Sequence, residues 1–122
     1  MLPSPAVVAP DEAAETAALF ALLADPLRLR IVQALAHEQL CTCHLEEITG
    51  AKQTTVSHHL RALREARVVV GEADGRFTWY RLAPGAFAGA AAALTELAGS
   101  GATGRLRPPC VPTSTPLAVE LP

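Results

Sequence analysis

The 122-residue chain lacks the marks of an exported or disulfide-stabilised protein. It has only three cysteines, an odd number that argues against a disulfide framework. Its N-terminus has no basic segment leading into a continuous apolar stretch, because Asp11 and Glu12 interrupt it early. We therefore expect a cytoplasmic protein whose thiols are kept reduced.

Long apolar runs and aromatic side chains are also scarce. The most apolar stretch, Ala86 to Leu94, is too short to span a bilayer, so no membrane partner is expected. Phe77, Trp79 and Tyr80 lack the interleaved basic residues that favour stacking on unpaired bases, so we expect them to pack within a hairpin. No nucleophile, base and orienting group converge in the sequence, which argues against an enzyme.

Charge is small overall but unevenly distributed. The net charge of −2 argues against a general polyanion binder. Residues 1–50 carry two basic and seven acidic side chains, a net of −5, whereas residues 51–82 carry six basic and three acidic ones, a net of +3. A local basic excess of this size favours a sequence-specific binder of double-stranded DNA.

Apolar residues recur at helical spacing through the first half of the chain. Asp25 is a good N-cap and Pro26 is tolerated at a first helical position, so a helix starts there. The predicted helices cover residues 11–24, 26–36, 42–49 and 53–66, and the third is ended by Gly50.

The second half of the chain predicts a β-hairpin and a last helix. A strand begins at Val68, Asp74-Gly75 is a hairpin-turn pair, Phe77 to Leu82 return, and Pro84 opens a helix over residues 85–98. The resulting order is mainly α-helical with a small β-hairpin, the order of a winged helix-turn-helix. The expected domains are a flexible N-terminal arm (1–10), a winged helix-turn-helix DNA-binding and dimerisation domain (11–98) and a largely disordered Pro/Gly-rich tail (99–122).

The helix predicted over residues 53–66 has the pattern of a DNA-reading helix. Val56, Leu60 and Leu63 share one face and should pack inward, and His59 beside them is expected to be partly buried and structural. The opposite face begins with short polar side chains that let the backbone approach DNA, followed by arginines suited to phosphates. The candidate DNA contacts are Lys52, Gln53, Thr54, Thr55, Ser57, His58, Arg61 and Arg64, together with Arg76 at the hairpin tip.

Two thiols, Cys41 and Cys43, lie at the start of the preceding helix. Within a regular helix this spacing would direct them about 200° apart, but Cys41 can sit outside the helix in an extended conformation. Free backbone N–H groups at a helix start should lower the thiol pKa values and favour metal binding. Chelation by both sulfurs should then unwind or reorient the first turn and oppose DNA binding. The alternative is two small buried apolar residues.

Four segments together resemble the ArsR/SmtB family of metal-sensing bacterial repressors. They are LADPLRLRIVQAL (23–35), LCTCHLEEI (40–48), TTVSHHLRALREA (54–66) and GRFTWYRL (75–82), and the resemblance covers roughly residues 17–98. It implies a homodimer, paired mainly through its first and last helices, that binds an inverted repeat in operator DNA and needs no cofactor to do so. It also implies that Cys41 and Cys43 match the family's inducer site for arsenite or antimonite. In some relatives, cysteines at this position contribute to cadmium, lead or zinc sites.

The sequence departs from the family at three positions. Glu46 stands where arsenical relatives often have a third cysteine, Lys52 replaces a Ser-like N-cap, and the last helix offers only Glu96, which excludes the family's second zinc site there. The third ligand is therefore open between Cys110, an outside thiol and water. His44 would suit a divalent ion, although an exposed position at the helix start is the simpler expectation for it.

The sequence thus predicts a repressor released by arsenite or antimonite at Cys41 and Cys43. Two alternatives stay open, namely a sensor of divalent cadmium, lead or zinc and a thiol redox switch.

Overall fold

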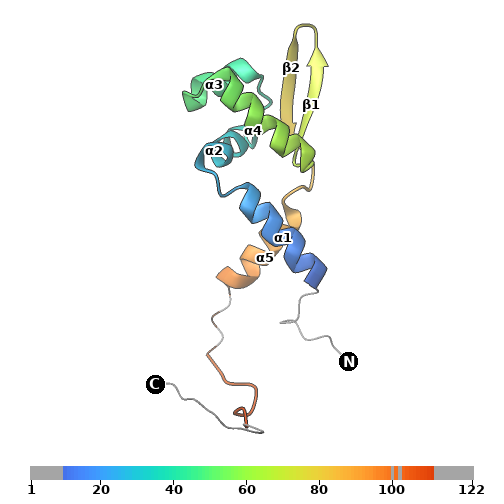
Figure 1. Ribbon diagram of the computed structural model, residues 1–122. Coiled ribbons are helices and arrows are strands. Elements are labelled where there is room, and N and C mark those ends of the chain that lie inside the picture. Colours follow the sequence, from blue (N-terminus) through green and yellow to red (C-terminus); the bar gives the residue numbers. More distant parts are fainter. Residues whose placement is uncertain (1–9, 100, 102, 112–122) are drawn as a thin grey trace.

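The computed structural model describes residues 10–99, 101 and 103–111 (Figure 1). Of the predicted arm and tail, residues 1–9, 100, 102 and 112–122 lie outside the described part, while Pro10 already belongs to the first helix. Residues 101 and 103–111 form neither helix nor strand. The elements of the described part are α1 (Pro10–Leu22), α2 (Pro26–Leu35), α3 (Thr42–Thr49), α4 (Gln53–Glu65), β1 (Val69–Asp74), β2 (Phe77–Leu82) and α5 (Ala88–Ala98), which confirms the winged helix-turn-helix order.

The start of α2 follows the sequence prediction closely. Asp25 is the N-cap in an extended conformation, and its carboxylate accepts hydrogen bonds from the backbone N–H groups of Leu27 at 2.9 Å and Arg28 at 3.0 Å. Pro26 occupies the first turn, where no N–H is needed. Two of the free donors at this helix end are thereby satisfied.

The turn between α3 and α4 is short and tightly bonded. Gly50 ends α3 with a φ of 75°, a left-handed conformation that favours glycine, and its N–H donates to the Glu46 carbonyl at 2.8 Å. The Thr49 hydroxyl accepts from the Ala51 N–H at 3.2 Å. These bonds fix the angle at which α4 leaves α3.

Arg30 of α2 holds the other side of this turn. Its guanidinium donates to the backbone carbonyls of Ile48 at 2.8 Å and Thr49 at 3.3 Å. A cation at the carboxyl end of α3 also complements the helix dipole. The three helices α2, α3 and α4 are therefore tied together by both apolar and polar contacts.

The hydrophobic core lies between α2, α3, α4 and the base of the hairpin. The predicted inward stripe of α4 is confirmed, because Val56 and Leu63 are completely buried and Leu60 is nearly so. The buried residues that form this core are Ile31, Val32, Leu35, Leu40, Leu45, Val56, Leu60, Leu63, Val68 and Val69.

The hairpin carries a third, short chain segment on its free edge. Strands β1 and β2 pair antiparallel from Val69↔Leu82 to Asp74↔Phe77, so the turn is Gly75–Arg76, one residue later than predicted. Leu40 forms an antiparallel bridge with Tyr80 of β2. The hairpin is the expected wing and projects away from the helices (Figure 1).

The packing expected of the hairpin aromatics is only partly correct. Trp79 and Tyr80 are half-buried, as predicted. Phe77 is 52% exposed because it lies beside the hairpin turn, beyond the reach of the helices. The prediction was therefore wrong for Phe77.

Helices α1 and α5 pack against each other at the end of the molecule opposite the wing and α3 (Figure 1). The last helix begins at Ala88, three residues later than predicted, because Gly85 adopts a left-handed φ of 74° that a helix cannot include. In the described residues no helix is long and apolar enough to cross a membrane.

Replacing Leu45 with alanine should lower the free energy of unfolding by about 2–5 kcal/mol, because this α3 side chain is fully buried and its loss leaves a cavity. Ile48→Ala on the same helix is the matched control, since Ile48 is 45% exposed, and should cost less than about 1 kcal/mol. Denaturant unfolding measures both values. Equal losses in the two variants would contradict the assignment of the core.

Candidate nucleic-acid interface and metal centre

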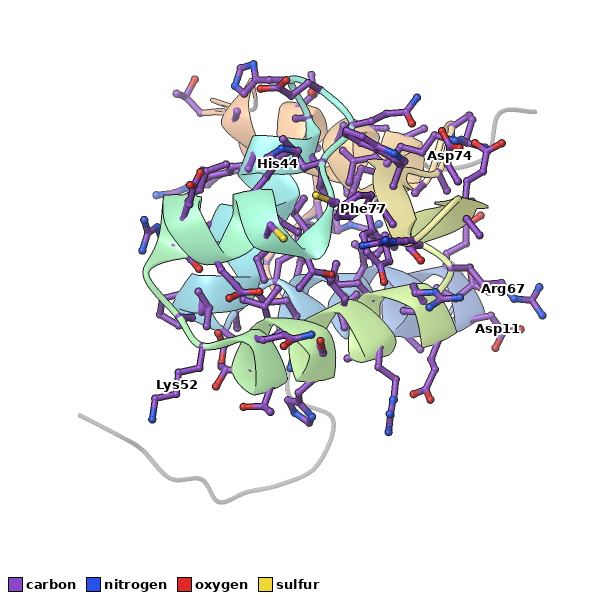
Figure 2. All side chains as sticks on the ribbon, turned by 90° about the horizontal axis from the view of Figure 1, so that it is seen from above. Asp11, His44, Lys52, Arg67, Asp74 and Phe77 are labelled. Atoms are coloured by element: carbon purple, nitrogen blue, oxygen red, sulfur yellow. The ribbon has the colours of Figure 1, made fainter. Side chains whose placement is uncertain are left out.

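Helix α4 presents one polar, solvent-exposed face. Lys52 is its N-cap, and its side chain makes no capping hydrogen bond but extends into solvent (Figure 2). The first backbone N–H groups of α4 are thus left open at a helix end that attracts anions. The predicted DNA-contacting residues on this helix are all exposed: Gln53, Thr54, Thr55, Ser57, His58, Arg61 and Arg64.

The wing lies beside this face. Arg76 is exposed in the turn at the wing tip, as predicted. The Arg64 guanidinium lies over the Tyr80 ring of β2, 5.9 Å from its centroid, within the range of a cation–π contact. Arg64 is therefore positioned by the wing, a feature that the sequence did not reveal. Ser57, Arg61, Arg64 and Tyr80 line a hollow of about 440 Å³ between helix and wing.

A buried histidine fixes the inner side of α4. His59 is 8% exposed, and its Nδ1 accepts a hydrogen bond from Arg28 Nε at 3.3 Å. Arg28 also donates to the Leu22 carbonyl at 3.1 Å, and His59 Nε2 lies 3.9 Å from the Asp25 carboxylate. The partly buried structural role predicted for His59 is confirmed. Through it, α4 is tied to the end of α1 and the start of α2.

The charge state of His59 follows from this environment. Burial lowers its pKa, nearby Asp25 opposes that effect, and Arg28 and His58 lower the pKa further. The pKa of Asp25 is itself lowered, chiefly by the hydrogen bond from the Arg28 backbone N–H. The neutral imidazole is the form that accepts the Arg28 hydrogen bond.

The two candidate thiols lie at the N-terminus of α3. Cys41 is the N-cap in an extended conformation (φ −97°, ψ 175°), as predicted, and it is buried, whereas Cys43 is exposed. The Cys41 side chain lies close enough to that of Cys43 to raise the pKa of the Cys43 thiol. The extended backbone at Cys41 therefore overcomes the divergence that a regular helix would impose. The thiols are neither far apart nor both walled off from solvent.

His44 belongs to the same group of side chains. Its Nδ1 accepts a hydrogen bond from the Cys41 backbone N–H at 3.1 Å and lies 3.3 Å from Cys41 Sγ. Its ring contacts Trp79 of β2 at a centroid distance of 5.6 Å. The simple exposed position expected for His44 is thus wrong, because His44 closes a capping box with Cys41 in the place usually taken by Glu or Gln.

The sulfur atoms of Cys41 and Cys43 and the Nδ1 of His44 are donors that suit a thiophilic ion. At ordinary bond lengths of about 2.0–2.1 Å to nitrogen and 2.3 Å to sulfur, two ligands of a tetrahedral ion lie about 3.6 Å apart. The separation of 3.3 Å between His44 Nδ1 and Cys41 Sγ is close to this value. Nevertheless, in the described residues no three Cys, His, Asp or Glu side chains form a preassembled metal cluster. An ion at this position must therefore draw its ligands together.

The pKa of Cys43 differs from the prediction. The sequence indicated lowered thiol pKa values at the helix start, but the pKa of Cys43 is raised. The main cause is the negative charge of neighbouring Cys41, and desolvation of the thiol adds to it. Two adjacent thiolates repel each other more than the helix end attracts them.

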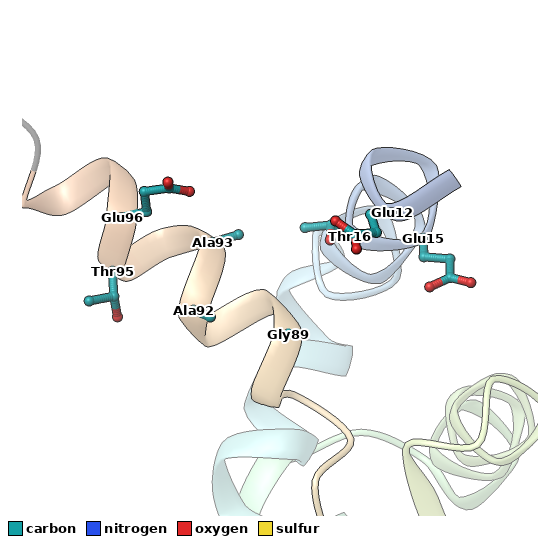
Figure 3. A pocket seen from close by; sticks show the side chains of 8 residues that line it. All are labelled: Glu12, Glu15, Thr16, Gly89, Ala92, Ala93, Thr95 and Glu96. Carbon is teal, nitrogen blue, oxygen red and sulfur yellow. The ribbon is translucent and has the colours of Figure 1, made fainter. Parts of the chain in front are cut away.

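Cys110 is not brought to this pair. It is exposed, and its segment, residues 103–111, extends from the α5 end of the molecule, opposite α3 (Figure 1). Glu96 lines a groove between α1 and α5, where Glu12 and Glu15 also lie (Figure 3). No histidine or cysteine lines that groove.

Sequence reasoning found both thiols and the exposed face of α4 but missed how they are connected. The capping role of His44 could have been read from its spacing, because it stands three residues after the N-cap Cys41. The Leu40–Tyr80 bridge and the Trp79–His44 contact carry no local sequence signal.

The chain is similar to known regulatory proteins. Residues 25–70 match the model of the arsR family of bacterial regulatory proteins. This range contains α2, α3, α4 and the start of the wing. The arsenical resistance operon repressor of Escherichia coli K12 is 38% identical over 79 residues, or 64% of this chain and 68% of that repressor. The chain belongs to the ArsR family. It is therefore a member of a family of bacterial regulators and not of an enzyme family.

Other proteins similar to this ArsR protein are also transcriptional regulators. The transcriptional repressor SmtB homolog of Synechocystis sp. is 43% identical over 79 residues, covering 65% of this chain and 60% of that repressor. The crystal structure of a possible transcriptional regulator for arsenical resistance superposes with a TM-score of 0.57 at 35% identity, over 63% of this chain and 80% of that one. The crystal structure of the transcriptional repressor BigR from Xylella fastidiosa superposes with a TM-score of 0.61 at 28% identity. The superposition covers 75% of this chain and 93% of BigR.

The match to some relatives is partial. This ArsR protein spans 60% of the Synechocystis repressor and 52% of the cadmium resistance regulator CadC of Listeria innocua, to which it is 44% identical over 62 residues.

Acidification should destabilise the fold through His59. Because its folded pKa is lowered, the unfolded chain binds more protons than the folded one below the ordinary value of 6.5. The stability contributed by neutral His59 is present above that pH and is lost as the pH falls through the window beneath it. Comparing urea unfolding at about pH 7.5 and about pH 5.5 should show a smaller pH dependence for His59→Gln than for wild type.

The control for this experiment is His37→Gln, at an exposed histidine. It should retain the wild-type pH dependence. An unchanged pH dependence in His59→Gln would refute the role assigned to the buried histidine.

Proposed function

We propose that this ArsR protein is a homodimeric transcriptional repressor that leaves its operator when a thiophilic metal or metalloid ion binds Cys41 and Cys43. The observation that carries the proposal is that Cys41 forms the N-cap of α3, the helix that packs directly against α4. Its relatives include an arsenical resistance operon repressor and a cadmium resistance transcriptional regulatory protein. The protein would act in the cytoplasm, where DNA is available and thiols stay reduced.

DNA binding would use α4 in the major groove. Gln53 near the helix start can pair with adenine, Thr54, Thr55 and Ser57 can reach bases or phosphates, and His58 lies on the same exposed face. Lys52, Arg61 and Arg64 would meet phosphates, and Arg76 on the wing would meet the backbone of the neighbouring groove. These assignments rest on the exposure of the side chains and, for those on α4, on their common face.

Dimerisation would use the α1–α5 end of the molecule. Leu94 of α5 is 52% exposed, and small residues such as Gly89, Ala92 and Ala93 line the adjoining groove (Figure 3). Small side chains allow another helix to approach closely, and burying Leu94 would remove apolar surface from water. A two-fold dimer would present two α4 helices to half-sites about 34–36 Å apart.

Release would follow from competition for the first turn of α3. His44 Nδ1 accepts the hydrogen bond of the Cys41 N–H at that turn and lies beside Cys41 Sγ, and chelation by Cys41 and Cys43 would require these side chains to reorient. Because α3 supports α4, ion binding and DNA binding oppose each other. A coupling of about 1–3 kcal/mol would weaken DNA binding about 5- to 150-fold.

Arsenite or antimonite is the first inducer to test, because arsenical repressors are among the relatives and both ions bind thiolates. The chain supplies two local thiols, so the third ligand would be Cys110 from either subunit, an outside thiol or water. A divalent ion such as cadmium, lead or zinc is the second candidate. The position of His44 Nδ1 beside Cys41 Sγ favours it, because nitrogen and sulfur donors together suit such ions.

The proposal is tested by measuring release of a labelled duplex, selected by the wild-type protein from a random library, against arsenite, antimonite, cadmium, lead and zinc. Cys41→Ser and Cys43→Ser should each raise the ion concentration needed for release at least about tenfold, because each removes one of two sulfur ligands. Cys110→Ser reports whether the tail supplies a third ligand. If Cys41→Ser and Cys43→Ser both release the duplex at the same ion concentration as the wild type, these thiols are not the sensor.

His44→Gln separates the two classes of inducer. It should weaken the response to cadmium or zinc by about 10- to 100-fold if nitrogen is a ligand, and it should have less effect on arsenite, which prefers sulfur. A peroxide arm in metal-free buffer tests the redox alternative, which the adjacent thiols allow. Release by peroxide alone would favour that alternative.

Phosphate contact by α4 is tested through salt dependence. The logarithm of the DNA-binding constant should fall steeply as salt rises from about 50 to about 200 mM. Arg61→Gln should reduce this slope by about 1, because one phosphate contact is lost. Arg107→Gln, in the exposed segment at the α5 end, should leave the slope unchanged. A flat salt dependence in the wild type would point to a winged helix used only for protein contacts.

A further inference from the structure

The chain segment that leads into Cys41 is bridged to strand β2 of the wing. Leu40, directly before Cys41, donates its N–H to the Tyr80 carbonyl at 3.1 Å and accepts from the Tyr80 N–H at 2.8 Å. Leu40 is only 5% exposed, so this pair of bonds is shielded from water. The backbone that enters the Cys41 cap is therefore an edge segment of the wing sheet.

A second contact joins the site to the same strand. The His44 ring packs on Trp79 at 5.6 Å, and Trp79 is the neighbour of Tyr80 in β2. Successive strand residues point to opposite faces, so Trp79 meets the cap while the Tyr80 side chain is directed to the other side. On that side the Tyr80 ring meets the Arg64 guanidinium of α4.

The Tyr80 ring occupies space that a side chain at position 71 would take. Gly71 is its partner across the hairpin, and a Cβ atom at Gly71 would come within 3.0 Å of the ring. The absence of a side chain at Gly71 lets the ring lie across β1 beside α4. Tyr80 thus contacts the cap segment through its backbone and the DNA-facing helix through its ring.

We propose that Tyr80 is the positioning residue that transmits ion binding from the Cys41–His44 cap to Arg64 and the wing. This inference rests on the proposed function and adds its route of regulation. Reorientation of Cys41 strains the Leu40–Tyr80 bridge, which shifts β2 and with it the Tyr80 ring under Arg64. Arg64 and the wing then lose their placement for DNA together.

The test compares DNA affinity with and without cadmium ion in full-length wild type and in Tyr80→Leu. The leucine variant keeps the backbone bridge and loses the ring contact with Arg64. The measured quantity is the ratio of the two DNA dissociation constants, which is independent of any change in ion-free affinity. Trp79, the single tryptophan of the chain, reports cadmium binding beside His44 by its fluorescence in the same samples.

In Tyr80→Leu the weakening of DNA binding by cadmium should fall about tenfold relative to wild type, while the Trp79 response is retained. Tyr80→Phe, which keeps the ring, and Phe77→Leu, the same kind of change at the exposed wing residue, should both keep the wild-type ratio. Arg64→Gln removes the other partner at an exposed position, and it should reduce the ratio as Tyr80→Leu does. The double variant should show no further reduction.

A wild-type ratio in Tyr80→Leu and in Arg64→Gln, with Trp79 still responding, would overturn the route through Tyr80 and leave the proposed function standing. Absence of any Trp79 response and of any DNA release in the wild type would instead remove cadmium sensing at this site, and this inference with it.

Discussion

The first turn of α3 depends on a local bond between the Cys41 backbone N–H and the Nδ1 of His44. A backbone donor at a helix end needs a partner, and here that partner is a side chain that can also ligate an ion. The Cys41 sulfur lies 3.3 Å from the same Nδ1 and is itself a candidate ligand. Helix capping and ion binding therefore draw on the same few atoms, so a local chemical event can become a change of helix geometry.

The rest of the domain limits where that change can go. On the inner side of α4, His59, Arg28 and Asp25 hold the helix to α2 and to the end of α1. On the α3 side, Arg30 and the bonds around Gly50 fix the following turn. The segment of Leu40 and Cys41 is different, because it is joined to β2 by one antiparallel bridge. Leu40 is also part of the core, so movement at the thiols reaches β2 directly through this bridge.

Much of this fold was accessible from the sequence because its signals are local. Asp25-Pro26 marks the start of α2, Gly50 marks the end of α3, and the apolar period of α4 identifies Val56, Leu60 and Leu63 as buried. The errors have equally physical causes. Local periodicity could not show that Gly85 would adopt a left-handed conformation, and a helix-end argument for low thiol pKa ignored the repulsion between two neighbouring sulfurs. The bridge from Leu40 to Tyr80 joins residues far apart in the chain and leaves no pattern.

In the proposed switch, an ion at the thiols dismantles the cap of α3 while α4 itself stays folded. Amide hydrogen exchange followed by NMR, with and without bound cadmium ion, tests this most directly. The Cys41 and Tyr80 amides should lose protection on ion binding, while the amides of Val56 and Leu60 should keep theirs. Unchanged protection at Cys41 and Tyr80 in the ion-bound protein would contradict it.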